Sequence, residues 1–372
     1  MRSTSSKHPL RAYTVLPFWI TLFSLALCLL LLLLSELSPA IADGLNGSLS
    51  QWLRRHLASV TSYLPFSLGE WVLMLTPTAL TFLLLLLFVR CHTAAARVRL
   101  LSFVLSVVFA ISSMHILTLG IAYRTTSLDG ALGFERREVS TEELYETAEL
   151  LRLRAEAELD AVTFGEGGSS VMPYSLDELS ASLCDAFAEV HATYGVADDF
   201  RSRVKAPVAS RVLSYAHLLG IYSFYTGEAN LNVDYPAYNF PFTSAHEMAH
   251  QRGVIREDEA NFVAHLVCIS SSDAYIRYSG YVNLLVYVLN ACYRASAAAG
   301  DTEAYSAFYK TIDVRIRREF YAESVHSEQY DTAFGELSSD LNDLYLQANG
   351  TAGAVSYGFV VDMAVAFYKG QR

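Results

Sequence analysis

The stretch His246-Glu247-Met248-Ala249-His250 decides the architecture that we expect for this chain, because it forms an HExxH motif. On an α-helix, residues four apart lie above one another on one face, so the two imidazoles can reach the same divalent ion. Zn²⁺ held by two His and one carboxylate keeps a fourth position for water, whose pKa it lowers to about 7. Glu247, beside that water, is the residue type that acts as general base in metallopeptidases. The motif therefore predicts a zinc-dependent hydrolase.

The residues around the motif predict a helix, a tight turn and a second helix. Thr243 or Ser244 is the expected N-cap, which would put the motif in the first turns of its helix. Gly253, three residues after His250, is typical of a helix end in the left-handed conformation. The acidic run at 257–259 then opens the second helix. We expect this arrangement to bring a carboxylate close to the two imidazoles.

The identity of that carboxylate is less constrained than the two His ligands. A metzincin would carry a third His where this chain has Arg256, so that class of protease is excluded. Glu257 shares a helix face with small Ala residues, which allow close approach to the HExxH helix, whereas Glu259 faces about 200° away. We therefore expect Glu257 to be the third ligand, with Glu259 in reserve and Asp258 as the remaining candidate.

A segment upstream of the motif resembles a substrate-binding edge. Residues 221–235 begin with an alternation of aromatic and β-branched residues, which predicts one or two short strands. A strand beside the metal helix can pair with a peptide by β-augmentation. On this interpretation Asn230 and Asn232 hydrogen-bond the substrate backbone, and Glu228 contacts a substrate amine. A polar hairpin edge with turn-forming residues is the alternative interpretation.

Several strings in this chain resemble a bacterial family of membrane-anchored HExxH proteins that is catalogued as a domain of unknown function. They occur in one order, at residues 120–124, 225–232, 240–253, 256–262 and 278–281. The resemblance covers nearly the whole chain and implies a zincin-like zinc peptidase whose substrate is unidentified. The Glu-x-x-Ala-Asn pattern from Glu257 to Asn261 also resembles the zinc helix of membrane gluzincins. That likeness implies that Glu257 binds zinc and that Asn261 steadies a His ligand.

The N-terminal third of the chain has the composition of a membrane domain. Hydrophobic residues make up 52% of the whole chain and charged residues only 17%. Three stretches are long and apolar enough to span a bilayer, at about 15–34, 71–89 and 100–123. We expect a membrane domain at residues 1–124 and a second domain at residues 135–372.

The distribution of basic residues predicts the orientation in the cytoplasmic membrane. Basic residues without acids precede the first span and fill the gap between the second and third spans, so both segments should be cytoplasmic. The chain is then a multi-pass protein of the lipid bilayer, with everything after about Arg124 outside the cytoplasm. The tripeptide Ala40-Ile41-Ala42 resembles a signal-peptidase site, so cleavage of the first span is an alternative; the C-terminal domain would be outside in either case.

The second domain is expected to be mainly α-helical, with an α+β zincin-like fold and a short β edge. Capping boxes at Ser140 and Ser175 predict helices to about residues 161 and 194. After the HExxH helix and the helix that opens with the acidic run, we expect further helices near 274–299, 302–322, 327–348 and 354–369. Three Cys, at 184, 268 and 292, lie in apolar helical patterns and are expected to be buried thiols. The net charge of −11 argues against nucleic acid as a partner.

Two hypotheses of function follow from these features. The first is a membrane-anchored zinc metallopeptidase that hydrolyses peptide or protein substrates outside the cytoplasmic membrane. The alternative is a non-catalytic, membrane-bound zinc-binding sensor or interaction protein. The presence of Glu247 favours the peptidase, because a structural zinc site needs no general base. The group that stabilises the oxyanion stays open among Tyr275, Tyr278, Tyr281, Tyr357 and His265.

Overall fold

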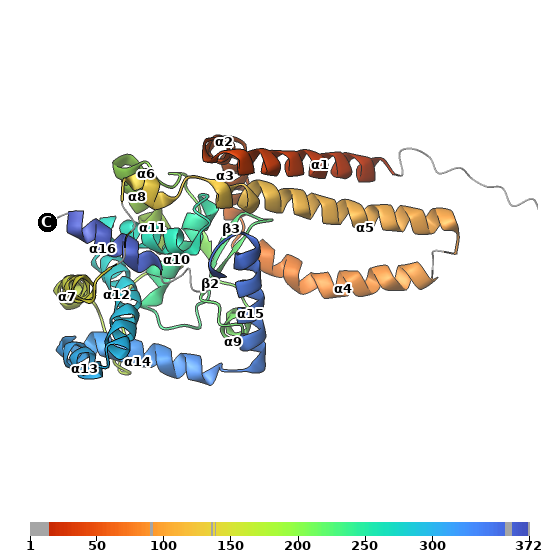
Figure 1. Cartoon of the computed structure of the whole chain (residues 1–372). Coiled ribbons are helices and arrows are strands. Elements are labelled where there is room, and N and C mark those ends of the chain that lie inside the picture. Colours follow the sequence, from red (N-terminus) through yellow and green to blue (C-terminus); the bar gives the residue numbers. More distant parts are fainter. Residues whose placement is uncertain (1–14, 90–91, 135–136, 138, 354–358, 371–372) are drawn as a thin grey trace, which may run out of the picture.

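The computed structural model describes the whole chain except residues 1–14, 90–91, 135–136, 138, 354–358 and 371–372. The described part is mostly helical and contains one small three-stranded sheet. Long helices extend from one side of a globular part that holds the sheet and the C-terminal helices (Figure 1). The prediction of a mainly helical chain with a short β edge is confirmed.

Among the residues that the structure describes, three helices are long and apolar enough to cross a membrane, as the sequence predicts. They are α1 (Leu16–Leu37), α4 (Leu68–Val89) and α5 (Ala94–His115), which continues through the short turns η3 (Ile116–Gly120) and η4 (Ala122–Arg124). Helix α1 packs along α5, and α4 extends from the globular part in the same general direction but apart from them (Figure 1). We refer to these three helices as the candidate spans.

The segment between α1 and α4 is helical and packs on the globular part. It contains α2 (Pro39–Leu45), η2 (Asn46–Ser50) and α3 (Gln51–Ser62). Its Arg54 is buried and donates to the carbonyl of Thr118, 3.1 Å away. The C-terminal end of α4 and the N-terminal end of α5 lie at the opposite end of the spans (Figure 1). The chain path therefore fits three crossings that leave this segment and the C-terminal part on the same side.

The globular part begins with α6 (Leu128–Leu132), α7 (Thr141–Glu158) and α8 (Leu176–Tyr194). Both predicted capping boxes are present: the Ser140 and Ser175 hydroxyls accept from the N3 backbone, and the N3 Glu carboxylates accept from the cap backbone. Such caps satisfy backbone N–H groups that the helix itself leaves without partners. Helix α8 ends at Gly195 in the left-handed conformation, with φ +69°.

The sheet has the order β1-β3-β2, with β3 in the centre. Strand β1 (Val204–Lys205) pairs parallel to β3 (Glu228–Leu231), and β2 (Gly220–Ser223) pairs antiparallel to it. The short helix α9 (Ser210–Tyr215) lies between β1 and β2 in the chain. As an edge strand, β2 leaves one side of its backbone for other contacts.

The HExxH motif lies on α10 (Asn239–Gln251), which packs against β3, α11 (Glu257–Ser270) and α12 (Ala274–Ala298). The prediction that Thr243 or Ser244 caps this helix is wrong, because the helix already starts at Asn239. Both residues are buried inside it, and the Phe242 N–H donates to the Ser279 hydroxyl of α12. Packing against α12 therefore replaces a local cap, and the motif occupies the last two turns.

The C-terminal helices are α13 (Thr302–Thr311), α14 (Val314–Gln329), α15 (Ala333–Ala348) and α16 (Val360–Gly370). The single helix expected over 302–322 is divided at Ile312, which is buried in an extended conformation. Asp313 then caps α14 by accepting from the Arg315 N–H at 2.8 Å. The burial of Ile312 therefore sets the break, and Asp313 caps the helix that begins after it.

The cysteines that the structure describes are free and buried, as expected for Cys184, Cys268 and Cys292. Cys268 faces the α12 backbone at Gly280, where an added side chain would clash with it. Burial raises the pKa of the Cys268 thiol well above its ordinary value. These thiols are packing groups of the core.

Candidate metal centre

The two imidazoles of the HExxH motif and one carboxylate of the next helix converge on a single point. The His246 and His250 rings lie 4.5 Å apart between centroids, one turn apart on α10. Glu257, the first residue of α11, has its Oε2 atom 3.1 Å from His246 Nε2 and 3.5 Å from His250 Nε2. One ligand atom from each of the three residues lies within 4.8 Å of the others, so the three could hold one metal ion.

These separations fit a tetrahedral cation. Ligands at about 2.0–2.1 Å from a tetrahedral Zn²⁺ lie roughly 3.3 Å from one another. The Glu257 Oε2 atom is buried, forms no regular hydrogen bond and faces both Nε2 atoms. A cation between the three groups would satisfy this atom. The donor set and its geometry therefore fit a divalent metal.

The turn between the helices makes this convergence possible. Gly253 has φ +92°, a conformation that favours glycine, and its N–H donates to the His250 carbonyl at 3.0 Å. The following residue, Val254, accepts at 2.8 Å from Nδ1 of the His250 ring. This bond assigns the proton of His250 to Nδ1 and leaves Nε2 as the ligand atom.

The charges of the centre are strongly coupled. Burial opposes ionisation of Glu257, but His250 and His246 outweigh it and hold the pKa of Glu257 well below its usual range. Burial also disfavours the charged form of His250, yet Glu257 and Glu247 raise its pKa to about 9. A cation that replaces the His250 proton would meet the same negative potential. The site is therefore electrostatically suited to positive charge.

Glu247 lies beside the centre against the edge strand. Its carboxylate accepts a hydrogen bond from the Tyr222 N–H of β2. A Cβ atom added to Gly220 would lie 2.6 Å from Glu247 Oε1, so the absent side chain of Gly220 is what allows this approach. Burial raises the pKa of Glu247, the direction that suits a residue that must accept and return a proton.

A groove passes the centre between β2 and α15. The groove contains two cavities, of about 340 and 290 Å³, and His246 and Glu247 line both of them. Both are bounded by Leu218 and Gly220 on the strand side and by Ser338 and Asn342 of α15 on the other. Helix α15 therefore forms the roof of the groove. The smaller cavity reaches the end of the third candidate span at residues 119–123.

The two alternative carboxylates for the third ligand point elsewhere. Glu259 accepts from the Leu128 N–H at 2.8 Å and pairs with Arg256 at 2.9 Å. Asp258 lines a separate cavity that also contains Arg256. Successive residues on a helix point about 100° apart, so Glu257, Asp258 and Glu259 lie on different faces of α11. Only the face of Glu257 is turned toward the two imidazoles.

Asn261 lines the groove but does not contact a His ligand as expected. Its side chain lies next to the hydroxyl of Tyr287. The Nδ2 atom of Asn261 and the Nδ1 atom of His246 are both buried without a hydrogen-bond partner among the described residues. The expected steadying contact is therefore not formed, although both residues line the larger cavity.

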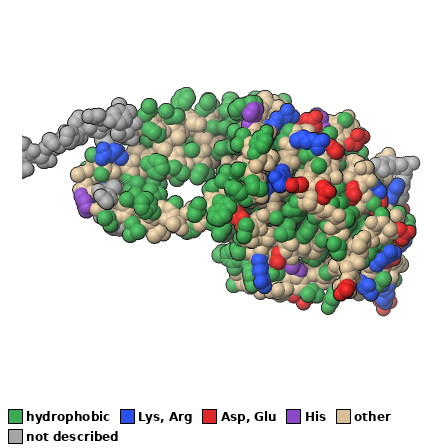
Figure 2. Space-filling model, turned by 180° about the vertical axis from the view of Figure 1, so that it is seen from behind, with side chains coloured by type: hydrophobic (Ala, Val, Ile, Leu, Met, Phe, Trp, Pro, Cys, Tyr) green, Lys and Arg blue, Asp and Glu red, His purple; other side chains and the backbone are tan. Residues whose placement is uncertain are grey.

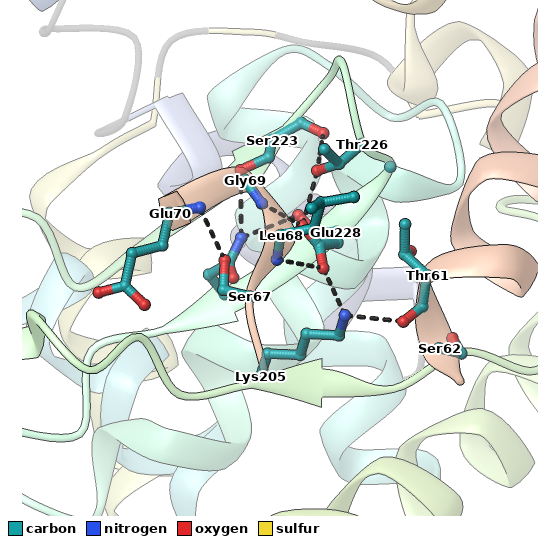
Figure 3. A network of polar contacts seen from close by, with 12 residues as sticks. Thr61, Ser62, Ser67, Leu68, Gly69, Glu70, Lys205, Ser223, Thr226 and Glu228 are labelled. Atoms are coloured by element: carbon teal, nitrogen blue, oxygen red, sulfur yellow. Dashed lines mark hydrogen bonds and ion pairs between the residues drawn. The ribbon is translucent and has the colours of Figure 1, made fainter. Parts of the chain in front are cut away.

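Glu228 has a structural position rather than the expected contact with a substrate amine. Its carboxylate is fully buried and forms an ion pair with Lys205 (Figure 3). It also accepts from the Leu68 and Gly69 N–H groups at the start of α4, at 2.9 and 2.6 Å, and from the Thr226 hydroxyl at 2.8 Å. Glu228 therefore joins the sheet to the second candidate span.

Asn230 and Asn232 are likewise occupied inside the protein. The Asn230 amide donates to the Ile221 carbonyl at 3.1 Å, and the Asn232 amide donates to the Leu218 carbonyl at 2.9 Å. Both side chains are buried, so they do not meet a substrate backbone. Both amides hydrogen-bond to the segment that contains β2, and β2 is the strand that borders the groove.

Four of the five groups expected as candidates for oxyanion stabilisation lie within the described residues, and none of these four lines the groove. His265 on α11 and the three tyrosines 275, 278 and 281 on α12 are buried in the core, and Tyr357 lies outside the described residues. Two other tyrosines line it instead. Tyr287 borders the larger cavity and Tyr345 the smaller one. Tyr345 comes from α15, about 95 residues beyond the motif, and no local sequence signal links it to the metal ligands.

Comparisons with known proteins identify a family without adding an activity. A family model described as "Protein of unknown function (DUF3810)" matches residues 46–365. No curated protein and no solved structure matches the chain. The matched range includes two of the candidate spans and every residue of the centre.

Proposed function

The chain belongs to the DUF3810 family, and we propose that it is a membrane-anchored, zinc-dependent metallopeptidase that cleaves peptide bonds outside the cytoplasmic membrane. One observation carries the proposal: His246, His250 and Glu257 converge at ligand separations, with Glu247 alongside. A structural metal site has no use for a buried carboxylate next to its ligands. The zincin-like fold is part of the same proposal.

In this proposal the residues divide the chemistry among them. His246, His250 and Glu257 hold Zn²⁺, which when bound supplies a water of lowered pKa and polarises the scissile carbonyl. Glu247 accepts the proton of the attacking water and returns it to the nitrogen of the leaving amine. Its raised pKa supports both halves of this transfer. The hydrogen bond from the Tyr222 N–H keeps the carboxylate oriented.

The groove supports a peptide as the substrate. An extended chain can add to an edge strand through backbone hydrogen bonds, and β2 is the edge strand that borders the groove. Tyr345 is our candidate for the hydroxyl that donates to the substrate carbonyl, because it lines the same cavity as all three ligands.

The experiment that tests the proposal is the substitution Glu247→Gln in the full chain. Loss of a general base lowers the rate by about 10²–10⁴. We expect the variant to keep its zinc but to lose cleavage of a quenched-fluorescent peptide library, while Glu259→Gln, which alters a carboxylate away from the groove, retains both. Chelator-sensitive cleavage that is as fast in Glu247→Gln as in the parent would refute the proposed mechanism.

A further inference from the structure

Helix α15 carries three different faces. Phe334, Leu337, Leu341 and Leu344 form one apolar stripe, and each side chain is 53–62% exposed. With about 100° per residue, this stripe covers roughly a quarter of the helix circumference. Ser338 and Asn342 lie on the next face and line the metal groove. We call the four exposed side chains the α15 stripe.

Helix α15 lies close to the candidate spans. The helix runs across the direction of α1, α4 and α5, on the side of the globular part from which they leave (Figure 1). Its C-terminal end meets the third span, where the Tyr345 hydroxyl lies 3.3 Å from His115 Nε2. Its N-terminal end abuts His217, which a Cβ on Gly335 would approach to 2.5 Å. The helix therefore lies at the level where the spans enter the globular part.

Other exposed apolar side chains lie at the same level. The Val208 N–H donates at 3.0 Å to Glu70, which lies in the first turn of α4, and the Val208 side chain is 85% exposed. Val212 of α9 is also exposed. Hydrophobic side chains cover the spans and the adjoining side of the globular part, whereas charged side chains are frequent on the rest of this view (Figure 2).

We propose that the α15 stripe lies in the interfacial region of the bilayer that the candidate spans cross, so that α15 is a membrane-seated roof of the metal groove. An amphipathic helix that lies in the membrane plane buries its apolar face about 5–10 Å into the headgroup boundary. The stripe is continuous with the level of the spans, so lipid is the medium already present there. A single row of side chains is also narrow for a stable protein partner, which needs roughly 20–30 residues a side.

The charge of α15 specifies the kind of lipid. The helix has no Lys or Arg, and its third face carries Glu336, Asp340 and Asp343. Anionic lipids attract basic helices, so an acidic face gives no such attraction. Burial of the apolar stripe therefore drives the binding of α15 to the bilayer, and zwitterionic lipids are sufficient for this binding.

This location has a consequence for the substrate, and that consequence rests on the proposed function. A chain that enters the groove passes between β2 and α15 at the bilayer surface, beside the end of the third span. The substrate class is then a segment of a membrane protein next to its own span. The location of α15 itself does not depend on catalysis.

The test measures the depth of α15 in the full chain, reconstituted in phosphatidylcholine vesicles. Leu341→Trp adds a fluorophore in the stripe, and Asp340→Trp adds one on the acidic face as the matched control. Relative to the parent with its three Trp, we expect lipids brominated in the upper acyl chain, at the 5–10 Å depth of interfacial helices, to quench the added Leu341→Trp signal roughly two-fold or more. Aqueous acrylamide should quench the Asp340→Trp signal instead.

Two outcomes would overturn the proposal. If acrylamide quenches both added signals and brominated lipid neither, the stripe faces water. If neither quencher reaches the Leu341→Trp signal, another protein surface, such as a second copy of the chain, covers it. Leu337→Trp repeats the measurement one turn away, so that a folding defect of one variant does not decide the result. Because no cleavage is measured, failure here is distinct from failure of the peptidase proposal.

Discussion

At the residue scale, two glycines set the geometry of the centre. Gly253 turns the chain between the metal helices, and Gly220 lets the edge strand lie directly against Glu247. In both cases the missing side chain is the functional feature, because any Cβ would occupy space that a neighbouring group needs. The position of Glu247, the proposed general base, is therefore set by the strand as well as by its own helix.

Gly220→Ala should impair turnover without removing the metal. The added methyl meets the Glu247 carboxylate at 2.6 Å, so the carboxylate must shift, and misplacement of a catalytic group by about 1 Å costs on the order of 10²-fold in rate. Zinc content and the initial rate of peptide cleavage check this. Gly47→Ala, where nothing lies within 4 Å of the new methyl, is the matched control. Equal rates in the two variants would argue against a role for this contact.

His265 should make stability depend on pH. Burial lowers its pKa to about 4, below the 6.5 of an exposed His, so the unfolded chain takes up a proton first. The stability that the neutral ring contributes, about 3 kcal/mol, is complete above pH 6.5 and is lost as pH falls from 6.5 to about 4. Denaturant unfolding of the parent and of His265→Gln checks this. The variant should show a flatter pH profile, and identical profiles would contradict the assignment.

The sequence predicts the convergence of His246, His250 and Glu257 because helical spacing and one turn determine it locally. It does not predict the neighbours of Glu228, because Lys205 and Leu68 come from distant parts of the chain. Asn230 and Asn232 show the same limit: an exposed polar edge and a buried polar support have the same residue pattern, and only the tertiary partners distinguish them.

At the scale of elements, the junction between the sheet and α4 depends on one buried ion pair. Lys205 on β1 and Glu228 on β3 are both almost fully buried, and Lys205 also donates to the Thr61 carbonyl of α3 at 2.7 Å (Figure 3). Removal of one member of such a pair leaves an uncompensated charge inside the protein. The pair thus connects the sheet to α3 and to the second candidate span.

Lys205→Met should therefore destabilise the protein by about 3–5 kcal/mol. Denaturant titration of the detergent-solubilised chain measures the loss. The double variant Lys205→Met/Glu228→Gln removes the uncompensated charge and should recover part of it. If the single substitution leaves the unfolding midpoint unchanged, the pair does not stabilise the junction.

Helix boundaries that depend on local caps can be predicted from the sequence, whereas boundaries that depend on tertiary packing cannot. The capping boxes of α7 and α8 are local, and both helices start where predicted. The start of α10 depends on α12, and the break at Ile312 depends on burial in the core, so neither appears in the local pattern. The sequence also does not predict that α15 covers the groove, because an amphipathic pattern does not say which neighbour the polar face of the helix contacts.

At the scale of the whole molecule, the centre lies next to the third candidate span although about 120 residues separate the motif from it. Leu119 and Tyr123, at the end of that span, line the same cavity as the three ligands. Distance along the chain is therefore a poor guide to distance from the candidate spans. The candidate spans and the candidate metal centre are joined by the segment around Arg54 and by the Glu228 network.

The zinc content of the purified full-length chain tests the central claim most directly, with Glu257→Gln and Glu259→Gln measured beside the parent. The three-ligand centre predicts one zinc ion per chain in the parent and in Glu259→Gln, and clearly less in Glu257→Gln, because only Glu257 faces the two imidazoles. Full zinc content in Glu257→Gln, or a parent chain that binds no zinc at all, would contradict the centre described above.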